Sequence, residues 1–187
     1  MKAERLESLQ AIEAAVWREL LAAPQDAQHP FRTPVLATTD GEIGDARTVV
    51  LRSVDAAKRR LTLFSDARAA KVAQLTTHPL GTLVHWSPAL NWQLRLRVRL
   101  EVQRDGLAVS SHWARLKLSP AAHDYLSALP PGSALDNALD NAIGTRGERE
   151  HFALILAQIL SIDWLELHPQ GHRRARFGDG PAIWLQA

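Results

Sequence analysis

Two arginines bracket a short apolar run in the segment RTVVLR, at positions 47 and 52. The residues between them, 48–51, are typical of a buried strand. A guanidinium group forms planar, bidentate contacts with phosphate and carboxylate groups. The segment therefore indicates either two solvated strand ends or an anion against the strand. The two positions are five residues apart, which places the side chains on opposite faces of one strand, so we do not expect them to hold the same anion.

A second basic segment, SDARAAK, spans residues 65–71 and carries Arg68 and Lys71. It is the expected start of a helix over 65–79, which Ser65 or Asp66 would cap. The first turn of a helix presents unpaired N–H groups and a partial positive charge, which together favour a phosphate group. Asp66 would repel an anion unless it points to its own helix.

A third segment, WQLRLRVRLEVQR over residues 92–104, alternates strictly between apolar and polar residues. The pattern predicts a strand with a buried face and a polar face that begins at Gln93. The amide of Gln93 can donate to a carbonyl group and accept from an N–H group of one flat heterocycle. An arginine-rich polar face is typical of a solvated or interface surface.

Several common site chemistries lack their motifs in this chain. There is no cysteine, no GxGxxG or GxxxxGK[ST] segment, no GxSxG elbow, and the eight histidines form no HxH or HxxxH pair. We therefore expect no metal site and no nucleophile supplied by the protein, so a cofactor would do the difficult chemistry of an enzyme. The formal net charge of +2 does not predict nucleic-acid binding, and no apolar run is long enough for a membrane span. A cytoplasmic protein is the expectation.

The elements that must position these residues form one domain over 1–187. An amphipathic helix and a loop are expected over 1–28, and a flexible loop over 130–150. The expected strands are 35–40, 46–55, 60–65, 81–87, 92–104 and 182–187, with a further strand starting at 173. Residues 109–128 are expected to be helical with a break near Pro120, and 152–167 to pass from helix into strand. The prediction is a mainly β fold, a small β-barrel with flanking helices.

Four segments in one order, RTVVLR, FSDARAAK, WSPALNWQLR and WLELHPQGHRRARF, resemble the pyridoxamine 5′-phosphate oxidase-like flavoproteins. The closest resemblance is to the oxidase-related FMN-binding proteins of that group, and it covers roughly residues 30–187. It implies a split-barrel homodimer with FMN at the interface and an oxidoreductase of unknown substrate. The FMN-binding positions that it implies are Arg47, Thr48, Val49, Val50, Phe64, Ser65, Arg68, Lys71, Gln93, Trp164 and Arg176.

The resemblance also implies a substrate site at Arg52, His172 and Arg174, where this chain departs from the true oxidases. Those enzymes have an Arg-x-His pair where this chain has His172 and Arg174 in the reverse order. They also have a tyrosine, an arginine and a serine that contact the substrate phosphate. An ungapped alignment places His112, Leu116 and Pro120 there. Each lost charge-assisted contact costs about 1.5–3 kcal/mol, so we do not expect oxidation of vitamin B6.

Three alternatives stay open at this stage. The protein could be a genuine pyridoxamine 5′-phosphate oxidase with an altered substrate site, or a non-catalytic protein that binds flavin or haem. It could also be a basic barrel that binds RNA, although the 93–101 face has no aromatic stripe on which bases could stack. No catalytic side chain can be assigned from the sequence.

Overall fold

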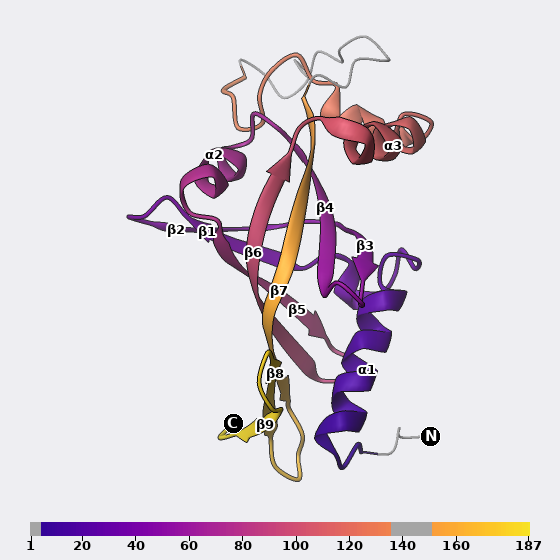
Figure 1. The fold of residues 1–187 in the computed structure, drawn as a ribbon, viewed down its shortest axis with the longest axis vertical. Coiled ribbons are helices and arrows are strands. Elements are labelled where there is room, and N and C mark those ends of the chain that lie inside the picture. Colours follow the sequence, from indigo (N-terminus) through magenta and orange to yellow (C-terminus); the bar gives the residue numbers. More distant parts are fainter. Residues whose placement is uncertain (1–4, 136–150) are drawn as a thin grey trace.

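The computed structural model describes residues 5–135 and 151–187, which form one antiparallel sheet with helices beside it (Figure 1). The strands are β1 (Val35–Thr39), β2 (Gly44–Thr48), β3 (Leu51–Asp55), β4 (Arg60–Asp66), β5 (Leu80–Ser87), β6 (Trp92–Gln103), β7 (Phe152–Glu166), β8 (Arg173–Gly178) and β9 (Ile183–Leu185). The α-helices are α1 (Leu9–Ala22), α2 (Ala70–Thr77) and α3 (Gly106–Leu116), and two 3₁₀ helices are η1 (Pro30–Arg32) and η2 (Pro120–Tyr125). The expected mainly β fold with flanking helices is confirmed. No helix among the described residues is long and apolar enough to cross a membrane.

The strand path has the order β2-β1-β5-β6-β7-β4-β3, and β8 and β9 extend it from β7. The sheet is not closed, because β2 and β3 stand at opposite ends of this path. These two strands are nevertheless consecutive in the chain, with only Val49 and Val50 between them. The sheet must therefore curl so that its two edge strands, β2 and β3, come close enough for two residues to connect them.

This connection corrects the expected single strand over 46–55. The N–H group of Val49 donates to the carbonyl of Pro34 at 2.9 Å, and the chain then leaves β1 to pair with β4. Arg47 and Arg52 thus belong to different strands at different edges. The expectation that they would not share an anion agrees with their separate contacts, although the reason is the strand change and not alternation.

The long strands β6 and β7 form the centre of the sheet. The alternation in β6 is as predicted, with Leu94, Leu96 and Val98 fully buried. The expected helical start of 152–167 is wrong, because β7 is one strand whose first half pairs with β4 and whose second half pairs with β8. A strand with neighbours on both sides and cover on both faces has a continuous apolar run, which periodicity alone cannot distinguish from a buried helix.

The helices complete the core. Helix α1 begins after Ser8, whose hydroxyl accepts from the N–H group of Ala11, and it buries Ile12, Val16 and Leu20. Helix α3 packs Trp113 onto Phe152 of β7 in a second apolar cluster. In Figure 1, helix α2 lies to the left of β6 and β7, whereas α1 and α3 lie to their right.

Helix α2 is shorter than the helix expected over 65–79, and only part of the loop expected over 130–150 is described. Helix α2 starts at residue 70 and not at 65, because Ser65 and Asp66 still belong to β4. The N-cap residue of α2 is Ala69, which has no side-chain acceptor. Residues 130–135 contain neither a helix nor a strand. The remainder of the expected loop, 136–150, lies outside the described residues.

Candidate functional site

The first basic site joins β2, β1 and α2, and we call it the Arg47 cluster. Nη1 of Arg47 donates to Thr38 Oγ1 at 2.6 Å and to the carbonyl of Leu36 at 3.4 Å. Nη2 donates to a carboxylate oxygen of Asp45 and, at 3.4 Å, to Gln74 Oε1. The guanidinium group is thereby fixed in orientation at the edge of the sheet.

Lys71 adds a second cation to the Arg47 cluster from the first turn of α2. Burial lowers the pKa of Lys71, and the positive charge of Arg47 lowers it further, against the opposing charges of Asp66 and Asp45. A nearby anion would favour the charged form of Lys71 and stabilise both cations. Lys71 follows the N-cap of α2, Ala69, which offers no side-chain acceptor to the first N–H groups of the helix. A phosphate group fits this donor set.

The described partners of Arg68 differ from those of Arg47. Its guanidinium group contacts both carboxylate oxygens of Asp66, at 3.1 Å and 2.7 Å, and donates to the carbonyl groups of residues 127–129. The N–H group of Arg68 also donates to Asp66, which therefore caps the turn before α2 and not the helix itself. Arg68 thus ties the segment after η2 to the end of β4.

The second basic site is a cleft of about 430 Å³ beside β3 and α3, which we call the Arg52 cleft. The guanidinium of Arg52 lies 5.1 Å from the ring of Phe64, and its Nε is buried without a hydrogen-bond partner among the described residues. His112 packs edge-on against the same ring, and burial, with the charge of Arg115, lowers its pKa. The imidazole of His112 is therefore neutral at pH 7.

The Arg52 cleft holds cations that sequence reasoning missed. Arg115 and Arg32 line it together with Arg52, and none of the described residues that line it is acidic. The alignment placed a leucine, Leu116, where oxidases have their arginine, yet Arg115 lies one position before it. Arg32 comes from η1, a segment with no motif to draw attention to it. The alignment suggested that this site had lost its cations, but the cleft is lined by three arginines that could bind an anion.

The third basic site is a cleft of about 290 Å³ on the outward face of the sheet, which we call the sheet-face cleft. Asp163 of β7 accepts from Arg95 of β6 at 2.8 Å and from both Nε and Nη2 of Arg174 of β8, at 3.0 Å and 2.7 Å. Burial raises the pKa of Asp163, but the hydrogen bonds from Arg174 and Arg95 outweigh it and leave that pKa below its ordinary value. Arg97 and Arg176 also line the cleft.

The structure distributes the other predicted residues unevenly. Gln93 lies on the same sheet as the sheet-face cleft, paired with Trp86 and Leu165. Trp164 is fully buried in the core with its ring edge-on to Trp92, and His172 sits in the turn before β8, where its Nδ1 accepts from the N–H group of His168. Neither of these two side chains joins a basic site.

The segments between these sites contribute mainly backbone. Thr48 ends β2, and Val49 and Val50 form the connection to β3. Ser65 is buried at the end of β4, where its hydroxyl donates to the carbonyl of Asp66 at 3.0 Å.

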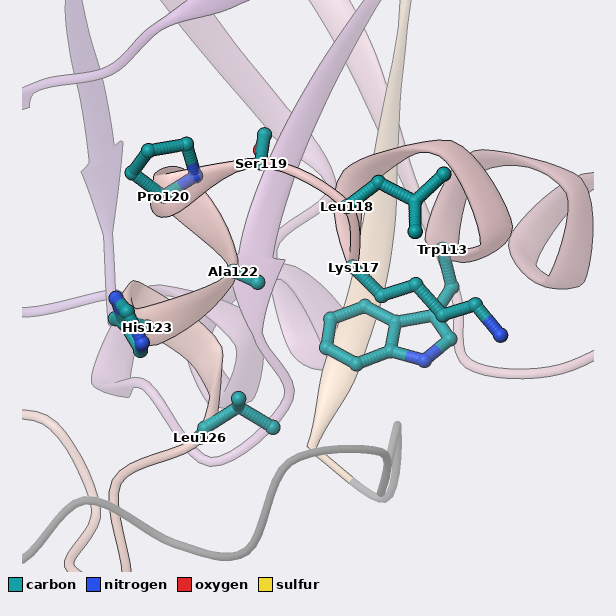
Figure 2. Close-up of a pocket in the computed structure, with 8 residues that line it drawn as sticks. All are labelled: Trp113, Lys117, Leu118, Ser119, Pro120, Ala122, His123 and Leu126. Carbon is teal, nitrogen blue, oxygen red and sulfur yellow. The ribbon is translucent and has the colours of Figure 1, made fainter.

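An apolar cavity of about 400 Å³ lies between α3 and η2 (Figure 2). Figure 2 shows Trp113 of α3 and Leu126 after η2 in its wall, with Lys117, Ser119 and His123 as its polar members. It shares no lining residue with the three basic sites. We assign no function to it.

Comparison with known proteins places these sites in a family context. Residues 14–104 match the family described as pyridoxamine 5′-phosphate oxidase, FMN-binding domain, which confirms the resemblance found in the sequence. A pyridoxine/pyridoxamine 5′-phosphate oxidase of Chromohalobacter salexigens is 32% identical over 81 residues, which is 43% of this chain. The match spans only 37% of the length of that oxidase.

Two solved structures share the whole fold. A pyridoxamine 5′-phosphate oxidase-related, FMN binding protein from Nostoc punctiforme superposes with a TM-score of 0.69 over 98% of this chain and 100% of its own, at 19% identity. PhzG from Burkholderia lata, solved in complex with tetrahydrophenazine-1-carboxylic acid, gives 0.66 over 94% of this chain and 92% of its own, at 16% identity. Because both identities are below 20%, the likeness establishes the split-barrel fold alone. The Arg47 cluster lies inside the segment matched by the FMN-binding domain.

Proposed function

We propose that this protein is an FMN-dependent oxidoreductase that works as a homodimer on a small anionic substrate. The observation that carries the proposal is the Arg47 cluster, in which Arg47 contacts Gln74 of α2 and its charge acts on Lys71 in the first turn of that helix. Paired cations beside open N–H groups match a phosphate monoester, and FMN carries one. When bound, FMN would supply the hydride acceptor or donor.

The protein's own contribution would be binding and orientation. Arg47 and Lys71 would hold the phosphate, while the backbone of Thr48, Val49 and Val50 would line the cofactor from the connection between β2 and β3. Phe64 and Ser65 follow on β4, close to the same region of the sheet. Arg68, which is committed to Asp66, and the buried Trp164 would support the site through the fold and not by contact.

The outward face of the sheet supports the proposed dimer. One row of paired positions runs across five strands, from Val35 through Val84, Arg95 and Asp163 to Arg176. Val35 in this row and Trp86 in the next are large apolar side chains that remain exposed. An apolar, arginine-rich face of this kind is typical of interfaces. A second copy seated there would bring its Gln93 and Arg176 to the cofactor.

The Arg52 cleft supports an anionic substrate. It combines three arginines with the aromatic ring of Phe64, a combination suited to a planar molecule with a carboxylate or phosphate group. Arg52 lines this cleft and no acidic side chain among the described lining residues competes for it. Arg115 and Arg32 keep a genuine pyridoxamine 5′-phosphate oxidase with an altered site as the second candidate.

The test is the absorbance spectrum of the purified protein, before and after FMN is added. We expect a flavin spectrum, one FMN per chain, a dimer by light scattering, and bleaching of the flavin by a nicotinamide donor. Protein that stays colourless with excess FMN contradicts the proposal. Bound flavin that no donor reduces favours a binding protein without turnover. Peroxide release with pyridoxine 5′-phosphate supports the second candidate.

A further inference from the structure

The two terminal nitrogen atoms of the Arg47 guanidinium have different partners. Nη1 is anchored to the sheet, through Thr38 Oγ1 and the carbonyl of Leu36. Nη2 faces Asp45 and Gln74 instead. An exchange of partners at Nη2 would leave the anchor at Nη1 intact.

Asp45 stands where an external anion would bind. Its carboxylate accepts from Nη2 of Arg47 and, at 3.2 Å, from Nε2 of Gln74. A hydrogen bond from Gln74 is the main reason that the pKa of Asp45 is lowered, with the charge of Arg47 as a further cause, so the group is ionised at pH 7. It therefore supplies a negative charge beside Arg47 and, together with Asp66, acts on Lys71.

The other carboxylate near Lys71 cannot exchange in this way. Asp66 has a side-chain exposure of only 3%, and both its oxygens are held by Arg68. The side chain of Asp45 is 47% exposed and belongs to β2, an edge strand of the path. Asp45 is thus the accessible acid of the Arg47 cluster.

We propose that Asp45 is an internal competitor for the phosphate group, which must displace it from Nη2 of Arg47 to bind. Asp45 thereby sets the affinity of the site and rejects anions too weakly charged to replace a carboxylate. In its application to FMN this inference rests on the proposed function, but the competition itself concerns any phosphate at the Arg47 cluster.

The test compares Asp45→Asn with wild type for inorganic phosphate and for FMN, by calorimetry and by quenching of flavin fluorescence. Asparagine keeps an oxygen that can accept from Arg47 and removes only the charge. We expect phosphate and FMN each to bind about fivefold more tightly, the scale of one partly solvated charge. Glu42→Gln removes a charge from the same β1–β2 hairpin, on an exposed residue, and should leave both affinities unchanged.

The outcomes separate the two proposals. If Asp45→Asn binds phosphate no more tightly than wild type, or more weakly, Asp45 positions Arg47 and the competition is wrong. Tighter phosphate binding with no uptake of FMN by either protein supports the competition and contradicts the proposed function. In an Arg47→Gln background the effect of Asp45→Asn should disappear, and its persistence there also contradicts the competition.

Discussion

Two arginine–aspartate groups, on different parts of the same sheet, use the same chemistry in opposite ways. In the sheet-face cleft, Asp163 receives three hydrogen bonds from arginines on two flanking strands, and its side chain is 16% exposed. In the Arg47 cluster, Asp45 pairs with an arginine two residues away on its own strand and is 47% exposed. A carboxylate bridging strands is part of the framework, whereas one at an edge with a single arginine is exchangeable. Connectivity and exposure, and not pairing alone, decide which arginine can serve a ligand.

The largest effect should come from removing the ligand-binding partner of the exchangeable pair. Arg47→Ala should weaken FMN binding about 100-fold, because a charge-assisted, anchored contact to the phosphate is lost. Fluorescence titration measures the dissociation constant, and circular dichroism confirms folding. Arg18→Ala, on the exposed face of α1, is the matched control. A change smaller than twofold for Arg47→Ala would remove Arg47 from the site.

A separate acid effect must be subtracted before the two aspartates can be compared at low pH. Burial lowers the pKa of His85 to about 4, and its Nδ1 bonds to the carbonyl of Phe31. The unfolded chain, with a histidine pKa near 6.5, binds the proton more tightly, so stability is full above that value and falls as the pH decreases towards 4. We expect a loss of about 2 kcal/mol between pH 7 and pH 5. Urea titrations at both pH values should show a smaller loss for His85→Gln, and an unchanged loss would contradict this assignment.

Stability then distinguishes the two aspartates directly. Asp163→Asn should lower the free energy of unfolding by about 1–2 kcal/mol, because Arg95 and Arg174 lose a shared, partly buried partner. Asp45→Asn should leave urea unfolding at pH 7 unchanged, since its pair is solvated. If the two variants lose equal stability, the distinction between framework and exchangeable pairs fails.

Acid should separate the same aspartates by the size of their contribution to stability, because the sign is the same for both. The pKa values of both Asp163 and Asp45 lie below 3.8 in the folded protein, so each stabilises it above that value and loses its contribution as the pH falls further. In a His85→Gln background, the fall in stability below pH 4 should become shallower with Asp163→Asn and stay almost the same with Asp45→Asn. A shallower fall with Asp45→Asn alone would reverse the comparison.

The smallest expected effect is the response to salt. The advantage of Asp45→Asn in phosphate binding should shrink when sodium chloride is raised, because solvated charges are screened within about 8–10 Å near physiological ionic strength. The stability difference between wild type and Asp163→Asn should change less. Titrations at low and high salt measure both, and an equal response would place the two aspartates in the same environment.

The strands were predictable where one face of the strand is buried and the other is exposed to solvent. The alternation of β6 identified its core face residue by residue, from Leu94 to Leu100. In the first part of β7 the alternation disappears because one face packs into the cluster around Phe152 and Leu154 and the other into the main core with Ile155 and Ala157, and the sequence there suggested a helix. The strand change at Val49–Val50 has no glycine or proline to mark it, since a long-range choice of partners causes it.

The site was predictable only in part, for a similar reason. Arg47 and Lys71 stand in recognisable segments, and the charge of Arg47 acts on Lys71. Arg32 and Arg115 come from separate helical segments that only the tertiary fold brings to Arg52. Arg68 looked equally suitable as a ligand, but its partners include carbonyl groups about sixty residues away in the chain, which no local pattern reveals. Local motifs therefore identified cations, and packing decided which of them face a ligand.

If a change of partner at Arg47 shifts β2, the connection at Val49 and Val50 would couple two binding equilibria. Two residues span at most about 7 Å, so a shift of β2 that follows a change of partner at Arg47 must reach β3 and Arg52. Thermodynamic linkage then makes the coupling reciprocal: the factor by which a phosphate at Arg47 changes affinity in the Arg52 cleft equals the factor in the other direction. Binding at one site would thereby change the affinity of the other through a connection of two residues.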